Sequence, residues 1–227
     1  MMDLKLRKIL PVVAVLVVVA GAVALYWFWT QGRAPHIPGM GPPTGAAPEA
    51  VLAVTADDMV LGSKDAPVTI VEYASLTCPH CARFEIDTLP RLQTAYIDPG
   101  KVRFVFRDFP LDPLALRAAM LAHCAGADRY FGFLQVLFQN QSDWDQAPDP
   151  EAALAGIAKL GGIGKEQFDR CMADESLSKR VIQSRHDAEK SLSIESTPTF
   201  FINGTKVSGS QPFEAFEEII NPMLPKS

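Results

Sequence analysis

Residues 68–81 read VTIVEYASLTCPHC, and this stretch decides the fold. Val68–Ala74 is a short run of apolar and β-branched residues, which predicts a buried strand. Cys78 follows at the position of a helix N-cap and Pro79 at the first helical position, where the missing proline N–H costs nothing. The stretch therefore predicts a buried strand that leads into a helix, with two cysteines at the start of that helix.

The residues after Cys81 predict the rest of a strand–helix–strand unit. Four residues recur at intervals of four and predict a helix: Phe84, Thr88, Leu92 and Tyr96. Pro90 lies within this helix and should kink it. Val102–Arg107 alternates in the manner of a second strand. Residues 68–107 thus predict two parallel strands joined by a helical crossover.

A block of helices and a short hairpin are predicted to follow. Residues 112–192 contain helix starts and stops but no strand pattern, and Asp112 and Asp128 each open a helix. Thr199–Val207 reads as two strands joined by an Asn-Gly turn, and Pro212 opens a last helix. The sequence predicts an α/β unit that is interrupted by helices and then resumed.

The N-terminal part of the chain predicts a membrane segment. Residues 9–29 contain no charge, and as a helix they would be roughly 31 Å long, which matches the hydrocarbon core of a bilayer. The run ends on the aromatic residues 26–29, which are typical of a membrane interface. A cleaved signal peptide is the alternative interpretation. In both cases the basic residues before the run keep residues 1–8 cytoplasmic and export the rest.

Composition and charge characterise the chain after the predicted membrane segment. Residues 30–51 are rich in proline and glycine and predict a semi-extended tether. The chain of 227 residues has a formal charge of −5, and because residues 1–30 carry +2 the remainder carries −7. An acidic exported part excludes nucleic acid as a partner, since that binding depends on Lys and Arg.

The spacing of Cys78 and Cys81 points to redox chemistry. The sulfur of Cys78 would face the free N–H groups and the positive end of a helix, which favour thiolate over thiol, and His80 can add a charge or a hydrogen bond. A dithiol whose reduced form is stabilised in this way has a disulfide that oxidises other thiols. Two alternatives are a structural disulfide, which would close a very small loop, and a zinc site. Four residues could complete such a zinc site: His123, Cys124, Cys171 and His186.

Gly62–Cys81 and Ser196–Gly204 resemble the corresponding segments of the DsbA-like thiol:disulfide oxidoreductases of the bacterial cell envelope. The resemblance covers about residues 52–224. It implies a thioredoxin fold made of residues 52–111 and 193–227, with residues 112–192 as an inserted helical domain. It further implies that Cys78 is the reacting surface cysteine, Cys81 its buried partner and Pro198 a cis-proline opposite the pair, with Thr197 just before it.

Glu72 matches the acidic residue that this family carries six positions before the first cysteine. Strand alternation places Glu72 on an apolar face, where an unpaired carboxylate would be costly. One interpretation is a buried acid with a raised pKa that manages the proton of Cys81. The other is a carboxylate that reaches solvent or a lysine at the sheet edge.

Cys124 and Cys171 are predicted to form a structural disulfide, because an even remainder of cysteines normally pairs in an oxidising compartment. Such a bridge would close a loop of about 48 residues and contribute roughly 4 kcal/mol. Free buried thiols are the alternative. We expect His123 and His186 to be ordinary helix-surface residues.

The resulting functional prediction is a membrane-anchored oxidase that passes its Cys78–Cys81 disulfide to reduced, newly exported proteins. It needs no metal or organic cofactor, and the resemblance implies reoxidation by a DsbB-like quinone-linked membrane protein. A disulfide isomerase or reductase is one alternative, favoured slightly by Thr197 before the proline. Against it, residues 31–58 are too short and too rich in proline to form the separate N-terminal domain through which isomerases dimerise. A non-catalytic metal-binding or client-holding module is the other.

Overall fold

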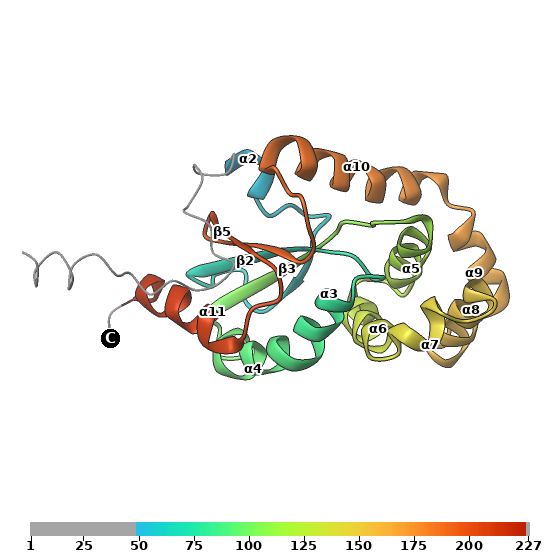
Figure 1. Cartoon of the computed structure of the whole chain (residues 1–227), viewed down its shortest axis with the longest axis horizontal. Coiled ribbons are helices and arrows are strands. Elements are labelled where there is room, and N and C mark those ends of the chain that lie inside the picture. Colours follow the sequence, from blue (N-terminus) through green and yellow to red (C-terminus); the bar gives the residue numbers. More distant parts are fainter. Residues whose placement is uncertain (1–48, 226–227) are drawn as a thin grey trace, which may run out of the picture. The chain divides into compact units, whose positions relative to one another are not determined.

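The structure is a computed structural model that describes residues 49–225. The predicted membrane segment, residues 9–29, and most of the predicted tether lie outside the described residues. Within residues 49–225 no helix combines the length and the apolar character that crossing a bilayer requires. The described residues form one mixed sheet with helices on both of its faces (Figure 1).

The sheet has five strands in the order β1-β3-β2-β4-β5. Its strands are β1 (Met59–Leu61), β2 (Val68–Ala74), β3 (Val102–Asp108), β4 (Thr199–Ile202) and β5 (Thr205–Ser208). The β2 and β3 strands are parallel and the other pairs are antiparallel, which confirms the predicted parallel pair and the predicted hairpin. The β1 strand was not predicted, because three residues give too short a pattern to recognise.

The helix that begins directly after Cys78 runs from Pro79 to Ile97 and contains two wider, π-helical turns. Its parts are α3 (Pro79–Arg83), the π-helical η1 (Phe84–Thr88), α4 (Leu89–Leu92) and the π-helical η2 (Gln93–Ile97). The four residues that recur every fourth position are all buried. A spacing of four is longer than the 3.6-residue turn of an α-helix, and the wider π turns keep these residues on one face. Pro90 directly follows the start of α4, after the first π segment.

Six helices separate β3 from β4. They are α5 (Pro113–Cys124), α6 (Ala127–Gln139), α7 (Gln141–Asp145), α8 (Pro150–Leu160), α9 (Lys165–Met172) and α10 (Glu175–Leu192). Asp112 caps α5 as predicted, since its carboxylate accepts from the Ala115 amide at 2.8 Å. The α6 helix begins at Ala127, one residue before the predicted Asp128. After β5 the chain ends its described part with α11 (Phe213–Ile220) and the short η3 (Asn221–Met223).

The two faces of the sheet carry two clusters of buried residues. The larger cluster joins one face of the sheet to the helix after the cysteines, to α11 and to the block of α5 to α9. The smaller cluster joins the other face to the C-terminal half of α10 through Ala188 and Leu192. Figure 1 shows α10 running across this second face beside α2 (Glu49–Leu52). The inserted helices therefore share a continuous core with the sheet.

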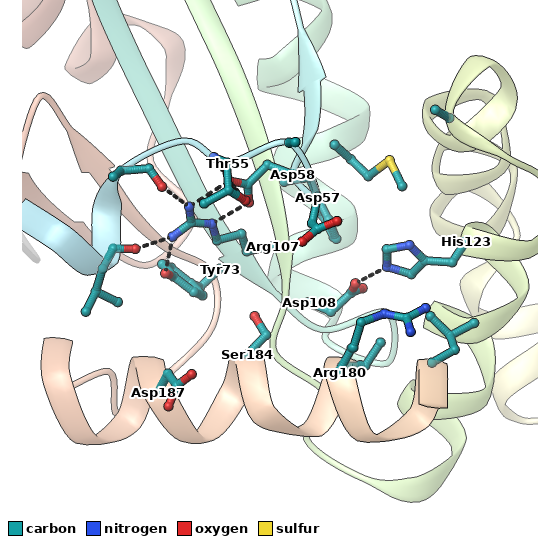
Figure 2. Close-up of a pocket in the computed structure, with 18 of the residues that line it drawn as sticks. Thr55, Asp57, Asp58, Tyr73, Arg107, Asp108, His123, Arg180, Ser184 and Asp187 are labelled. Carbon is teal, nitrogen blue, oxygen red and sulfur yellow. Dashed lines mark hydrogen bonds and ion pairs between the residues drawn. The ribbon is translucent and has the colours of Figure 1, made fainter. Parts of the chain in front are cut away.

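A partly buried arginine ties the segment before β1 to the sheet (Figure 2). Arg107 donates through Nε to Asp58 Oδ1 at 2.7 Å and through Nη1 to the Tyr73 hydroxyl at 2.8 Å. It also donates to the carbonyl oxygens of Val51 at 2.5 Å and Ala53 at 2.9 Å. One side chain thus holds the chain entering the fold against β2 and β3.

Candidate active site

The two cysteines lie at the junction between β2 and α3. Cys78 is the N-cap residue of α3, with an extended backbone, and Pro79 is the first residue of the helix. The Cys78 amide donates to the carbonyl of Ser75, and the Ala82 amide donates to the carbonyl of Cys78, both at 3.1 Å. The structure confirms the predicted positions of Cys78 and Pro79 at the helix start.

A buried glutamine from the helical block holds this junction. Gln141, the first residue of α7, donates through Nε2 to the carbonyls of Leu76 at 2.7 Å and Cys78 at 3.1 Å. Buried main-chain carbonyls need such donors. The role of Gln141 could not be predicted, because nothing local in the sequence marks a contact with a residue 63 positions away.

The two thiols are both free in the structure and differ in burial. Cys78 retains 6% of its surface and Cys81 retains none, while Pro79 and His80 are exposed. Cys81 is therefore the buried partner, as the resemblance implied. Cys78 is less exposed than a surface cysteine, because its neighbours cover most of the sulfur.

The surroundings shift the pKa values of the two thiols in opposite directions. Hydrogen bonding from the Cys81 thiol, together with the backbone N–H groups of Cys81 and His80, lowers the pKa of Cys78 from 9.0 to about 5, although burial opposes this shift. Burial, with the neighbouring Cys78, raises the pKa of Cys81 well above 9.0. At neutral pH the reduced site therefore holds a thiolate at Cys78 and a thiol at Cys81.

A cis peptide bond lies opposite the cysteines. The Thr197–Pro198 bond is cis, as the resemblance implied, and it directly precedes β4. The Cys78 sulfur lies 3.4 Å from the Thr197 carbonyl oxygen. The Thr197 hydroxyl is buried and has no hydrogen-bond partner among the described residues. Thr197 and Pro198 thus lie on the Cys78 side of the site.

Two buried carboxyl groups lie behind the cysteine pair. Glu72 is 0% exposed, and neither of its oxygens has a hydrogen-bond partner among the described residues. Its register partners are Phe106 on β3 and Phe200 on β4, so no lysine at a sheet edge compensates it. Burial first, and then the neighbouring Glu85, raises the pKa of Glu72 well above its usual value. The alternative in which Glu72 reaches solvent is wrong.

Glu85 is the second acid, and it was not predicted from the sequence. It lies in η1, is 8% exposed, and burial raises the pKa of its carboxyl to about 7. Glu85 follows Cys81 by four positions on one helix, and this spacing places both side chains on one face. A buried Cys81 therefore signals that Glu85 is buried as well.

Comparisons with known proteins agree with this geometry. A thioredoxin family model matches residues 54–222. The crystal structure of α-DsbA1 from Wolbachia pipientis superposes with a TM-score of 0.72 at 32% identity, covering 77% of this chain and 94% of that one. The chain belongs to the DsbA-like branch of the thioredoxin superfamily.

Other members of this DsbA-like group extend the comparison. The crystal structure of BdbD from Bacillus subtilis gives a TM-score of 0.67 at 26% identity and covers 79% of this chain and 96% of that one. A Rickettsia bellii protein named "Putative protein-disulfide oxidoreductase" is 34% identical over 151 residues, which are 66% of this chain. The DsbA-like chain spans 58% of that relative's length, which is less than two thirds.

The second cysteine pair forms a disulfide. Cys124 at the end of α5 is bonded to Cys171 in α9, with Cα atoms 6.0 Å apart. Because both sulfurs are used in this bond, neither can ligate the zinc ion that the alternative interpretation requires. Within residues 49–225 no cluster of three or more His, Cys, Asp or Glu side chains is placed to hold a metal.

His123 is not an ordinary helix-surface residue, and that expectation is wrong. Its Nε2 atom lies 2.7 Å from Asp108 Oδ2, and its side chain is only 20% exposed. Its ring centroid lies 4.9 Å from that of Tyr130. His186 agrees with the expectation, since its side chain is 65% exposed on α10.

Proposed function

We propose that this chain is a thiol:disulfide oxidoreductase that introduces disulfides into exported proteins through Cys78 and Cys81. The observation that carries the proposal is that the surroundings lower the pKa of Cys78 and raise that of Cys81, so the thiolate is favoured at Cys78 and disfavoured at Cys81. A stabilised thiolate is a good leaving group and stabilises the reduced form, so the disulfide oxidises other thiols. Proteins with similar sequences carry names of this activity, among them disulfide bond formation protein D of Bacillus subtilis.

The proposed reaction consists of two exchanges. A substrate thiolate attacks the Cys78 sulfur, the Cys78–Cys81 bond breaks, and Cys81 leaves and takes up a proton. A second substrate thiolate then attacks the substrate sulfur of this mixed disulfide and releases Cys78 as the thiolate. Two substrate thiols are oxidised to one disulfide, and the two electrons reside on the reduced cysteine pair.

The order of attack can be tested by trapping. Cys81→Ala is first converted to its Cys78–glutathione mixed disulfide. Thiolates of reduced substrate proteins should then displace glutathione and accumulate as mixed disulfides with Cys78, seen as slower bands on a denaturing gel without reductant. The control Cys78→Ala;Cys81→Ala should form none. Absence of trapped species with Cys81→Ala, or the same bands in the control, would contradict the assignment.

The direction of the reaction can be tested by the redox potential. We expect the Cys78–Cys81 couple, equilibrated with glutathione, to be less negative than about −180 mV, the value for protein disulfide isomerase. A value near about −270 mV, the potential of thioredoxin, would identify a reductase instead.

One observation favours an isomerase as the second candidate. The Thr197 hydroxyl is buried beside the cis bond without a partner among the described residues, so a bound substrate strand could use it. An isomerase should restore activity to scrambled ribonuclease without added oxidant when it is supplied reduced. Failure in that assay, combined with oxidation of reduced ribonuclease by the oxidised chain, would leave the oxidase as the function.

We also propose that residues 9–29 anchor the chain in the membrane, with the catalytic part on the extracytoplasmic side. The support is the length, charge and aromatic ending of that segment. The full chain should stay with membranes after carbonate extraction, and added protease should digest it in spheroplasts. Recovery of a chain that lacks its first 30 or so residues from the soluble fraction would show a cleaved signal instead.

A DsbB-like quinone-linked membrane protein is the proposed reoxidant. Reduced chain should be reoxidised by membranes supplied with quinone and not by quinone-depleted membranes. The tether of residues 30–51 would keep the catalytic part within reach of such a partner.

A further inference from the structure

Each turnover must move one proton to or from a sulfur that has no contact with solvent. Cys81 is 0% exposed, and it is a thiol when reduced and carries no proton when it is bonded to Cys78. The inference that follows rests on the proposed function, because it concerns how that proton travels. A direct route past Cys78, which keeps 6% of its surface, is the competing explanation.

Buried polar atoms without partners mark a different route. Within the described residues, both carboxylate oxygens of Glu72, one oxygen of Glu85 and the hydroxyl of Tyr130 are buried and make no hydrogen bond. A buried polar group without a partner is costly, so several together need an explanation. A path that exchanges protons supplies one, because its members gain and lose hydrogen-bond partners during the reaction.

These atoms belong to elements that pack together. The α6 helix, which carries Tyr130, contacts both η1, which carries Glu85, and α3, which carries Cys81. The Tyr130 ring lies 6.1 Å from the ring of Phe106, the register partner of Glu72 on β3. Tyr130 itself is 0% exposed. It therefore lies beside the two acids.

His123 and Asp108 continue this line to the surface. The His123 ring lies 4.9 Å from the Tyr130 ring and bonds to Asp108 at 2.7 Å. Asp108 lies two residues after Phe106 on β3, so both side chains are on one face of the sheet. Burial first, and then the negative charges of Asp108, Glu85 and Glu72, raise the pKa of Tyr130 well above its usual value, so Tyr130 keeps its proton.

The outer end of the line opens into a pocket (Figure 2). His123 and Asp108 both line this pocket, which has a volume of about 700 Å³. Figure 2 shows the hydrogen bond between these two side chains at the wall of the pocket. The other charged residues on its wall are Asp57, Asp58, Arg107, Arg180 and Asp187. Of these, Arg107 and Asp58 are committed to each other.

We propose that Tyr130, His123 and Asp108 form a proton route that connects the Glu72–Glu85 pair, and through it Cys81, to solvent in this pocket. During reoxidation the Cys81 thiol gives its proton to the acid pair, and the Cys81 thiolate attacks Cys78 within a mixed disulfide with the oxidising protein. The Cys78–Cys81 bond forms, the oxidant's sulfur leaves, and the proton exits through Tyr130 and the His123–Asp108 pair. During substrate oxidation the proton travels inward along the same residues. All three act through Glu72 and are positioning residues.

The test measures the step that uses the Cys81 proton. The full chain is prepared with a Cys78–glutathione mixed disulfide, and the release of glutathione is followed by stopped flow from pH 5 to 8 in H₂O and D₂O. We expect Tyr130→Phe and His123→Gln to slow this release at least fivefold and to increase the solvent isotope effect. Imidazole at millimolar concentration should restore the rate of His123→Gln, because the pocket admits it.

Matched controls come from the same chain. Tyr96→Phe removes a hydroxyl that bonds to Glu217 and Asn221, far along the helix from Cys81, and His186→Gln removes an exposed histidine. Both should release glutathione at the rate of the unchanged chain. The absorbance titration of the Cys78 thiolate should be the same in all variants, which separates a proton route from a general disturbance of the site.

Three outcomes would overturn the proposal. Release within twofold of the unchanged chain for both Tyr130→Phe and His123→Gln would show that the proton leaves past Cys78. Slower release with no change in the isotope effect, or without rescue by imidazole, would show a structural effect alone. If Tyr130→Phe does not fold, Asp108→Asn replaces it under the same criteria. The proposed function would survive each of these results, since it fails only if Cys81→Ala traps no mixed disulfide.

Discussion

Lowering the pH should remove a specific part of the stability of the reduced protein. The pKa of Cys78 falls from 9.0 to about 5 on folding, so the folded reduced chain binds fewer protons than the unfolded chain between these values. The resulting stabilisation is complete above pH 9, shrinks as the pH falls, and is gone below pH 5. The oxidised chain has no thiol at Cys78 and lacks this contribution altogether.

The size of the effect follows from the lowered pKa. At pH 7 the unfolded thiol is still protonated, so the stabilisation corresponds to the two pH units between 7 and 5. At about 1.36 kcal/mol per pH unit this is about 2.7 kcal/mol. Cys81 adds nothing in this range, because its raised pKa leaves it a thiol in both states. The same free energy makes the disulfide more oxidising by about 60 mV.

Urea unfolding measures this contribution. The free energy of unfolding is determined for the reduced and the oxidised chain at pH 7, 6, 5 and 4, and the two values are subtracted at each pH. The difference, reduced minus oxidised, should fall by about 2.7 kcal/mol from pH 7 to 4. Subtraction cancels groups that titrate alike in both forms.

A variant without the thiolate is the control. Reduced Cys78→Ser, compared with the oxidised chain, should show no such dependence over the same range. A difference between reduced and oxidised chain that stays constant within about 0.5 kcal/mol from pH 7 to 4 would refute the reasoning, since a Cys78 pKa of 6 in the folded chain would already give about 1.4 kcal/mol. An equal dependence in Cys78→Ser would refute it as well.

Three further variants have expected outcomes. Replacing Cys124 and Cys171 by serine should lower the free energy of urea unfolding by about 4 kcal/mol while the glutathione potential of the catalytic pair stays unchanged; a shifted potential would contradict a purely structural role. Arg107→Ala should cost about 1–3 kcal/mol, because Asp58 loses its charged partner and the carbonyls of Val51 and Ala53 lose their donor. The same variant should also expose the segment before β1 to limited proteolysis, and an unchanged digestion pattern would contradict this. Gln141→Ala should cost about 1–3 kcal/mol and speed the reaction of the catalytic cysteine with an aromatic disulfide reagent, and unchanged kinetics would argue against its positioning role.

The strands and helices with strong local patterns could be predicted from the sequence. Val68–Ala74 has the predicted bounds and α5 begins directly after Asp112 as predicted, because a β-branched run and a capping aspartate are local features. The β1 strand and α7 could not be predicted, since each is short and is stabilised by contacts with distant segments. The π segments after the cysteines also went unpredicted, although the four-residue spacing was their signal.

The residues of the site also divide into those with a local signal in the sequence and those without one. Cys78, Cys81, Pro79 and the cis bond before Pro198 follow from a motif and a resemblance that are both local in the sequence. The burial of Glu72 could be inferred from strand alternation, because its neighbours on that face are apolar. His123 could not be assigned, because its partners Asp108 and Tyr130 come from a strand and another helix.

The cost of burying Glu72 is understandable only together with Cys81. A thiol whose pKa is raised by burial attacks slowly unless a nearby base accepts its proton, and a carboxylate of ordinary pKa is too weak a base for that task near neutral pH. The burial that raises the pKa of Cys81 also raises those of Glu72 and Glu85, the latter to about 7, so the acceptor is adjusted together with the donor. Burial would disfavour the oxidation of substrate thiols if it also raised the pKa of Cys78. At Cys78, however, the hydrogen bond from Cys81 and the N–H groups at the start of α3 lower the pKa and outweigh burial. The first turn of α3 thus separates Cys78, which the helix N–H groups favour as a thiolate, from Cys81, which burial keeps as a thiol, and the three-residue spacing of the cysteines spans that boundary.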